Sequence, residues 1–363
     1  MSLFPGCIFI LKGLFCLEGI DSGLITEARA IIAESFAMDA HFDIAMDMDD
    51  RRERGERNVF SKRHEEPIRS GGWKCIVSSI FIHSYYLPEM GLRKALDQIS
   101  ALFSEEAEQP DALSICSCIQ EADRAIANGR TAILISLEGA DPLGNDPALL
   151  GIFHRLGVRG MGLAWSRRNY AADGCFFKDR REGRKGGLTP FGVDLLEEAE
   201  RLGILIDISH LNDEGIEDVA RFAKKPFIAS HSNCRALVPS MRNLTDEQIR
   251  LVASRGGVIG MNGCSAFVST ESQDVVDASD LCCHIDHIVR LVGVDHVGLG
   301  LDCCDGFTDY FQSTPSIETY DVIKGHGALP ELVAALIGKG YDAEEIRKIV
   351  GGNFRRVFEE VVG

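Results

Sequence analysis

Histidines and carboxylates occupy the positions where the apolar strands predicted from this sequence end. In chain order these residues are His41, Asp43, Glu138, His210, His231 and Asp302. Imidazole and carboxylate groups are the ligand types that suit a first-row divalent metal ion. In a parallel barrel the carboxyl ends of the strands meet at one face, and the chemistry of such folds gathers there. The pattern therefore predicts that these six side chains form one metal-dependent site.

Two pairs within this set have a spacing that suits a shared ion. His41 and Asp43 are two residues apart, so on an extended segment both side chains point to the same side. His210 and His231 end consecutive predicted strands. Because neighbouring parallel strands lie about 4.8 Å apart, two histidines at matching heights could chelate one ion. Each pair alone is a weak signal, and the agreement of all the strand ends makes ligation the better interpretation.

The two remaining carboxylates leave alternatives open. Glu138 ends the apolar run TAILISLE, where an ionised carboxylate is costly unless it is paired or binds metal. A salt bridge to Arg167 or Arg168 is one solution, and bridging of two cations by its two oxygens is the other. Asp302 ends HVGLGLD and is either a ligand or the acid/base for a metal-bound water. Asp305 competes with it for the second role.

The elements that must position these residues are short apolar runs alternating with amphipathic helical patterns. The candidate strands are 36–41, 73–81, 131–137, 158–164, 204–209, 226–230, 256–261 and 296–301. The helical patterns are 114–128, 147–156, 190–202, 212–224, 245–254, 279–292, 329–338 and 342–360, and Thr245 to Gln248 has capping-box spacing.

Eight such strands separated by helices predict an α/β fold, a (β/α)₈ TIM barrel with extra C-terminal helices. The alternative is a doubly wound sheet. That fold would need a Gly-rich phosphate loop after the first strand, where this sequence has His41-Phe42-Asp43. The length of 363 residues gives a prior of about two domains, but a decorated barrel reaches it too. We therefore expect a single barrel domain over residues 1–363.

Composition excludes some classes of partner. Hydrophobic residues make up 45% and charged residues 26%, as in an ordinary globular protein. The 38 Lys+Arg against 55 Asp+Glu give a net charge of −17. This balance argues against nucleic acid, because phosphate binding needs a basic surface, and it fits an anionic membrane surface poorly.

The N-terminus and the cysteines bear on the compartment. Residues 3–20 are apolar but interrupted by Pro5, Lys12 and Glu18, which is too short and too broken for a membrane span. They lack the basic start and small-residue cleavage site of a signal peptide. We expect residues 1–24 to be an N-terminal extension packed on the barrel.

The twelve cysteines are scattered without a C-x-x-C pair, which favours reduced thiols and a cytoplasmic localisation.

Several motifs, in the same order, resemble the membrane (renal) dipeptidase family over residues 25–360. They are M-D-A-H-F-D, I-S-L-E-G-A, I-D-I-S-H, I-A-S-H-S-N, M-R-N-L-T-D-E-Q-I, H-I-D-H-I-V-R-L-V-G-V-D-H-V-G-L-G and the closing G-G-N-F. The resemblance implies a metal-dependent barrel of the amidohydrolase type with two zinc ions. It also implies a dipeptide substrate and tolerance of a D-residue at the C-terminal position. A homodimer is a separate expectation for the assembly.

The resemblance further implies a role for each matching residue. His41 and Asp43 would bind one zinc, His210 and His231 the other, and Glu138 would bridge them together with a water or hydroxide that attacks the amide carbonyl. Asp302 would be the catalytic acid/base, and Arg242 would hold the C-terminal carboxylate of the substrate. A planar guanidinium can grip a carboxylate bidentately, so the residue type suits that role.

Two departures from the family pattern bear on the substrate. Trp165 stands where the family often has a histidine that contacts the substrate, and Arg168 or Asn169 could replace that contact. The usual S-D-F-D-G is here L-D-C-C-D-G, which alters the loop that carries Asp305. The alternatives are therefore an amidohydrolase on another small amide, lactam or acylated amino acid, and a barrel that serves only for binding.

Overall fold

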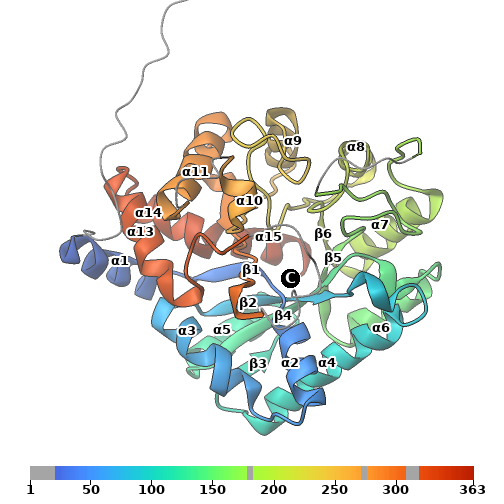
Figure 1. Cartoon of the computed structure of the whole chain (residues 1–363), viewed down its shortest axis with the longest axis horizontal. Helices are drawn as coiled ribbons and strands as arrows, with labels where there is room; N and C mark the ends of the chain where they lie inside the picture. Colours follow the sequence, from blue (N-terminus) through green and yellow to red (C-terminus); the bar gives the residue numbers. More distant parts are fainter. Residues whose placement is uncertain (1–20, 178–182, 271–275, 308–318) are drawn as a thin grey trace, which may run out of the picture.

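Parallel strands form a barrel surrounded by helices (Figure 1). The computed structural model describes residues 21–177, 183–270, 276–307 and 319–363. Most of the N-terminal extension predicted for residues 1–24 lies outside these ranges, so its packing on the barrel stays a prediction. The assignment of residues 1–363 to a single domain also stays a prediction. One sheet has the order β1-β2-β4-β5-β6 and a second pairs β7 with β8. Their bounds are β1 (Met38–Phe42), β2 (Cys75–Phe81), β4 (Thr131–Glu138), β5 (Val158–Gly162), β6 (Leu205–Asp207), β7 (Ile259–Met261) and β8 (Val297–Leu299).

The barrel closes through two junctions that are not regular strand pairs. Residues 226–230 connect the sheets by parallel bridges from Asp207 to Ile228 and from Ala229 to Ile259. Between β8 and β1, the Asp302 N–H donates to the His41 carbonyl at 3.2 Å. The predicted TIM barrel is confirmed, with 226–230 pairing by single bridges where a full strand was expected.

The predicted helix 114–128 is wrong at its start. Leu113–Ile115 forms a short strand, β3, beside the first residues of β4, and α5 begins at Ile119 and ends at Ala127. The register explains why. β5 pairs with β4 only from Ile135 onward, so the earlier backbone groups of β4 are free to pair with β3.

The helices predicted at 147–156, 190–202, 212–224, 245–254, 279–292 and 329–338 are observed within two residues of the predicted bounds, and Gln248 and Thr245 form the predicted capping box. They are α6 (Ala148–Arg155), α7 (Pro190–Leu202), α8 (Asp213–Phe222), α9 (Asp246–Ser254), α11 (Ala278–Val292) and α13 (Leu329–Gly338). The structure adds helices that the sequence patterns did not predict, namely α1 (Ser22–Glu34), α2 (Ile44–Glu53), α3 (Glu65–Gly71), α4 (Gly91–Glu108) and α10 (Ser265–Val268).

The pattern 342–360 is not one helix. It divides into α14 (Ala343–Arg347), a π-helical turn and α15 (Asn353–Val361). The break lies at Gly351, where a Cβ atom would come within 1.8 Å of the Phe36 carbonyl oxygen. Only glycine allows the chain to approach the start of β1 so closely.

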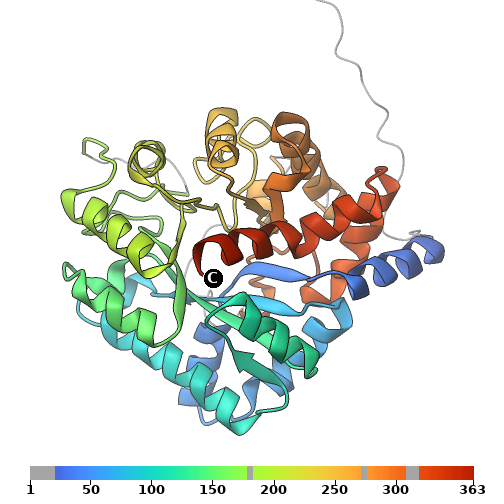
Figure 2. The same ribbon diagram turned by 180° about the vertical axis from the view of Figure 1, so that it is seen from behind.

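α15 covers the amino-terminal end of the barrel (Figure 2). Its Phe354 and Phe358 belong to one buried cluster with Met38, Cys75 and Ala132, which lie in the first two positions of their strands. The carboxyl ends of the strands therefore lie at the opposite end, away from α15. Among the described residues, no helix combines the length and the apolar character that crossing a membrane requires.

Candidate metal and catalytic site

The six predicted residues converge at the carboxyl end of the barrel. His41 lies in β1, Glu138 ends β4, and Asp302 follows β8. Ligand atoms lie within 4.8 Å of one another in three overlapping groups. These groups are His41 with Asp43 and Asp302, Glu138 with His210 and His231, and His41 with Asp207 and His231.

Glu138 lies at the centre of this cluster. Its Oε1 is 2.9 Å from Nε2 of His210, 3.6 Å from Nε2 of His231 and 3.7 Å from Nε2 of His41. The Nε2 atoms of His210 and His231 are themselves 2.9 Å apart. One carboxylate thus contacts imidazoles from both predicted ligand sets, as a bridging ligand must.

His41 and Asp43 carry buried polar atoms without partners. His41 Nε2 and Asp43 Oδ1 are 3.9 Å apart, and neither has a hydrogen-bond partner in the described structure. His41 Nε2 is also 3.9 Å from Asp302 Oδ1. Buried polar atoms are normally satisfied, because leaving one unpaired costs about 1–3 kcal/mol. A cation between these atoms would satisfy both, so the residues present fit a metal ion.

Three serines fix the orientation of the three imidazoles. Their Oγ atoms contact histidine Nδ1, from Ser79 to His41 at 2.9 Å, from Ser166 to His210 at 2.7 Å and from Ser230 to His231 at 2.6 Å. Each ring therefore presents Nε2 to the cluster. Metal-binding histidines commonly use the second ring nitrogen in this way.

Asp207 determines the tautomer of His231. The Ser230 hydroxyl donates to Asp207 Oδ2, and the other Asp207 oxygen accepts the N–H groups of Ser209 and Ser230. A hydroxyl has one proton, so Ser230 must accept from Nδ1–H of His231. Nε2 of His231 is then unprotonated and presents a lone pair to the cluster. The sequence patterns assigned no role to Asp207 or to the three orienting serines, although I-D-I-S-H contains Asp207 and A-S-H contains Ser230.

The backbone is strained at two of the predicted residues. His210 has a φ of +70° and Asp302 a φ of +53°, in the left-handed region that non-glycine residues rarely adopt. Strain of this kind is retained mainly at functional sites, where the surrounding structure enforces it. No sequence pattern indicated it.

Burial determines the protonation preferences of the cluster. Burial, with the charge of Arg242, lowers the pKa of His41 to about 3, and burial also holds the pKa of His210 and His231 well below the usual value. Burial and the neighbouring carboxylates raise the pKa of Glu138 and Asp43. The cluster therefore combines neutral imidazoles with buried carboxylates that lack a compensating positive charge. Ionising these carboxylates costs free energy without metal, and bound cations would offset that cost.

Burial also raises the pKa of Asp302 to about 6. Asn262, which follows β7, donates from Nδ2 to Asp302 Oδ2 at 3.0 Å and so orients the carboxylate. A carboxyl group with a pKa near neutrality can both accept and return a proton. The geometry and chemistry of Asp302 thus suit an acid/base.

Arg242 is buried beside the cluster, and one of its three nitrogen atoms has no hydrogen-bond partner in the described structure. Its Nη2 donates to the His231 carbonyl at 2.8 Å and its Nη1 to Ser232 Oγ at 3.0 Å. Nε is buried and has no hydrogen-bond partner in the described structure. The guanidinium thus carries a fixed positive charge and an unpaired donor next to the predicted ligands.

Trp165, which replaces the family's histidine, and the two residues predicted to take over its substrate contact lie in different surroundings. The Trp165 ring is 5.6 Å from the His210 ring, at the site. Arg168 pairs with Asp173, and its side chain is 58% exposed. Asn169 bonds to the backbone of its own loop, accepting from Ala171 N at 2.8 Å. Contact of Arg168 and Asn169 with substrate stays a prediction.

The alternative of a salt bridge from Glu138 is wrong. Arg167 pairs with Asp141 at 3.4 Å, and Arg168 pairs with Asp173. Both arginines therefore use other carboxylates, and the near neighbours of Glu138 are the histidines.

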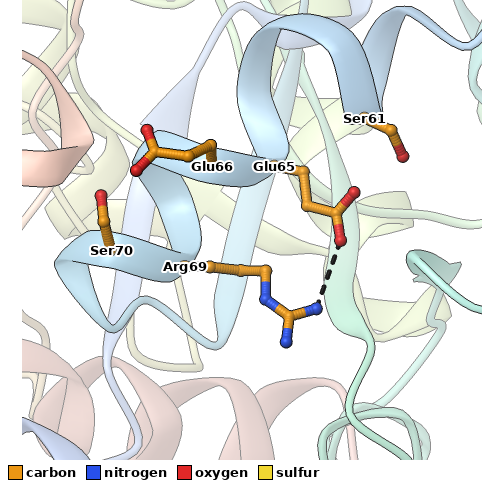
Figure 3. Close-up of a pocket in the computed structure, with 5 residues that line it drawn as sticks. All are labelled: Ser61, Glu65, Glu66, Arg69 and Ser70. Atoms are coloured by element: carbon orange, nitrogen blue, oxygen red, sulfur yellow. Dashed lines mark hydrogen bonds and ion pairs between the residues drawn. The ribbon is translucent and has the colours of Figure 1, made fainter.

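A hollow of about 470 Å³ lies elsewhere on the surface, near α3 (Figure 3). It is lined by Ser61, Glu65, Glu66, Arg69 and Ser70. Arg69 donates to Glu65 at 3.2 Å, so its one basic side chain already pairs with an acidic neighbour. None of the residues that line it belongs to the metal cluster.

Comparison with known proteins gives a consistent result. The family profile described as membrane dipeptidase (peptidase family M19) matches residues 25–362. An uncharacterized protein in the pqqA 5' region of Klebsiella pneumoniae is 32% identical over 267 residues, which is 73% of this chain and 94% of that protein. The dipeptidase tcpJ of Claviceps purpurea is 30% identical over 270 residues, covering 74% of this chain and 60% of tcpJ.

A solved structure supports the same relationship. It is a metallo peptidase from Rhodobacter sphaeroides liganded with a phosphinate mimic of the dipeptide L-Ala-D-Ala. It is 27% identical to this chain with a TM-score of 0.79, and the match covers 90% of this chain and all of the other. The barrel and nearly the full length of the described chain are therefore shared.

Proposed function

Since the chain belongs to the membrane dipeptidase family, peptidase family M19, we propose that it is a dipeptidase that uses two zinc ions. The observation that carries the proposal is the position of Glu138, whose Oε1 faces Nε2 of three histidines at 2.9 to 3.7 Å. The unpartnered atoms of His41 and Asp43 support the same arrangement.

Each residue has a distinct role in this proposal. His41 and Asp43 would hold one ion, His210 and His231 the other, and Glu138 would contact both. When bound, the two ions would polarise the scissile carbonyl and supply a water nucleophile of lowered pKa. The serines behind the imidazoles hold the rings in place, which keeps the ligand atoms oriented before substrate arrives.

The protons and the substrate are handled by residues of the chain. Asp302 would accept a proton from the attacking water and return it to the leaving amine, with Asn262 holding one of its carboxylate oxygens. Arg242 would bind the C-terminal carboxylate through its free Nε–H. Recognition of that carboxylate restricts the enzyme to substrates with a free C-terminus close to the scissile bond.

We propose that the substrates include L-Xaa-D-Xaa dipeptides. The relative from Rhodobacter sphaeroides binds a phosphinate mimic of L-Ala-D-Ala, which supports this stereochemistry. A second candidate function is that of an amidohydrolase that acts on another small amide or an acylated amino acid. Trp165 favours this candidate, because the indole stands where the family often has a histidine.

Metal removal tests the proposal directly. Protein stripped with a chelator should hydrolyse neither L-Ala-L-Ala nor L-Ala-D-Ala, and about two zinc ions per chain should restore activity. Metal analysis and an assay of released alanine provide the two measurements. A stripped protein with full activity contradicts the metal mechanism. A zinc-loaded protein that cleaves neither dipeptide, but cleaves N-acetyl amino acids, supports the second candidate.

Arg242→Gln is expected to remove the selection for a free C-terminal carboxylate. Loss of a buried, hydrogen-bonded charge pair costs about 2–5 kcal/mol, so kcat/KM for L-Ala-D-Ala should fall on the order of 100-fold. The C-terminal amide of the same dipeptide should be a poor substrate for both proteins. Arg201→Gln is the control, because Arg201 is 67% exposed and pairs with Glu198 on α7. An unchanged preference for the free acid in Arg242→Gln would contradict the assigned role.

A further inference from the structure

Three aromatic side chains, Trp165, Phe177 and Phe267, form a continuous wall beside the cluster. The ring centroids of Trp165 and Phe177 are 5.3 Å apart in an edge-to-face arrangement. Those of Phe177 and Phe267 are 5.9 Å apart with the planes inclined by 19°. These distances are typical of direct aromatic packing. We call the three residues the aromatic wall.

The aromatic wall extends between the two groups that would fix the substrate. At one end the Arg242 guanidinium carbon lies 5.8 Å from the centre of the Phe267 ring. At the other end the His210 ring lies 5.6 Å from Trp165 and 6.0 Å from Phe177. The wall therefore flanks the interval between the predicted carboxylate-binding residue and the predicted metal ligands.

The wall retains free apolar surface. Phe177 is 38% exposed, whereas Phe267, whose ring stacks against that of Phe177, is 8% exposed. Phe81 is buried and packs against Trp165 at 5.1 Å, which restricts the movement of the indole. An exposed phenyl ring that stacks on a buried one is a preformed apolar surface for a ligand.

We infer that the aromatic wall is the subsite for the side chain of the substrate's C-terminal residue, and that it selects large apolar side chains there. The inference rests on the proposed dipeptidase function. In a dipeptide the C-terminal Cα carries the carboxylate, the scissile nitrogen and the side chain. Once Arg242 holds the carboxylate and the amide lies at the metal cluster, that Cα lies between them. Its side chain then lies alongside the wall.

The test compares Ala-Ala with Ala-Phe, in whichever configuration of the second residue the enzyme prefers. Wild-type kcat/KM should be at least about tenfold higher for Ala-Phe, since even one methylene in an apolar pocket can change kcat/KM by about 10-fold or more. Phe177→Ala should reduce this ratio to near one. The ratio of the two kcat/KM values is the readout. If Phe177→Ala only displaced His210, kcat/KM would fall for both dipeptides and the ratio would stay unchanged.

Tyr170→Ala is the matched control. Tyr170 is an aromatic residue of the same loop region, is 59% exposed and is outside the wall, so its removal should leave the ratio at the wild-type value. A wild-type ratio near one, or an unchanged ratio in Phe177→Ala, overturns the inference while the dipeptidase function stands. Failure of the zinc-loaded wild type to cleave either dipeptide would instead overturn the proposed function.

Discussion

Glu138→Gln is expected to abolish dipeptide hydrolysis and to remove at least one of two bound zinc ions. The change keeps the size of the side chain but removes the charge that faces three imidazoles. Loss of an outer-shell partner alone typically costs 10- to 100-fold in metal affinity or activity, so loss of the bridging ligand should exceed about 100-fold. Metal analysis after gel filtration and a dipeptide assay measure the two effects.

Stability should respond to Glu138→Gln with opposite signs in the two metal states. Without metal, burial raises the pKa of Glu138, so the variant no longer carries a buried uncompensated charge and should be at least as stable as wild type. With zinc at about 100 times its Kd, wild type should gain about 2.7 kcal/mol per site, and the variant should gain less. Thermal unfolding with and without zinc measures both differences.

Glu198, whose side chain is 29% exposed and pairs with Arg201 on α7, provides the control. Glu198→Gln removes the same charge from the surface and should leave zinc content, activity and the zinc-dependent stabilisation at their wild-type values. If Glu138→Gln bound two zinc ions and cleaved dipeptides at the wild-type rate, the bridging role would be refuted.

Asp302→Asn should lower kcat by about 10²- to 10⁴-fold, the usual contribution of a general acid or base, and leave the zinc content unchanged. Asparagine preserves the shape of the side chain but cannot accept and return a proton. In wild type the base must be ionised, so kcat/KM should rise with pH through the pKa of Asp302. That pKa is raised to about 6 by burial without metal, and bound cations would lower it.

The zinc content of Asp302→Asn separates the two roles considered for this residue. Loss of zinc would identify Asp302 as a ligand, since its carboxylate lies in the group with His41 and Asp43. Wild-type activity in the variant would exclude both roles. Asp97→Asn, at a surface carboxylate that pairs with Arg93 on α4, is the control and should behave as wild type.

Much of the fold was predictable because it is encoded by local patterns. The helices at 190–202 and 329–338 have the predicted bounds, and seven of the eight predicted strands are observed as strands. Apolar periodicity and capping depend on residues a few positions apart, so they can be read along the chain. The errors arose where distant backbone groups determined the result, as when β4 paired with 113–115 and Phe36 approached Gly351.

The sequence by itself determined which residue types end the strands and therefore which side chains could reach a common metal site. Only the tertiary structure decided their distances, the unpartnered atoms of His41 and Asp43, and the strained backbone at His210 and Asp302. It also brought Asp207, the serines and the aromatic wall into the site. The physical reason is barrel closure: Leu301 donates to Asp39 across 262 residues of sequence, and no local pattern encodes such a contact.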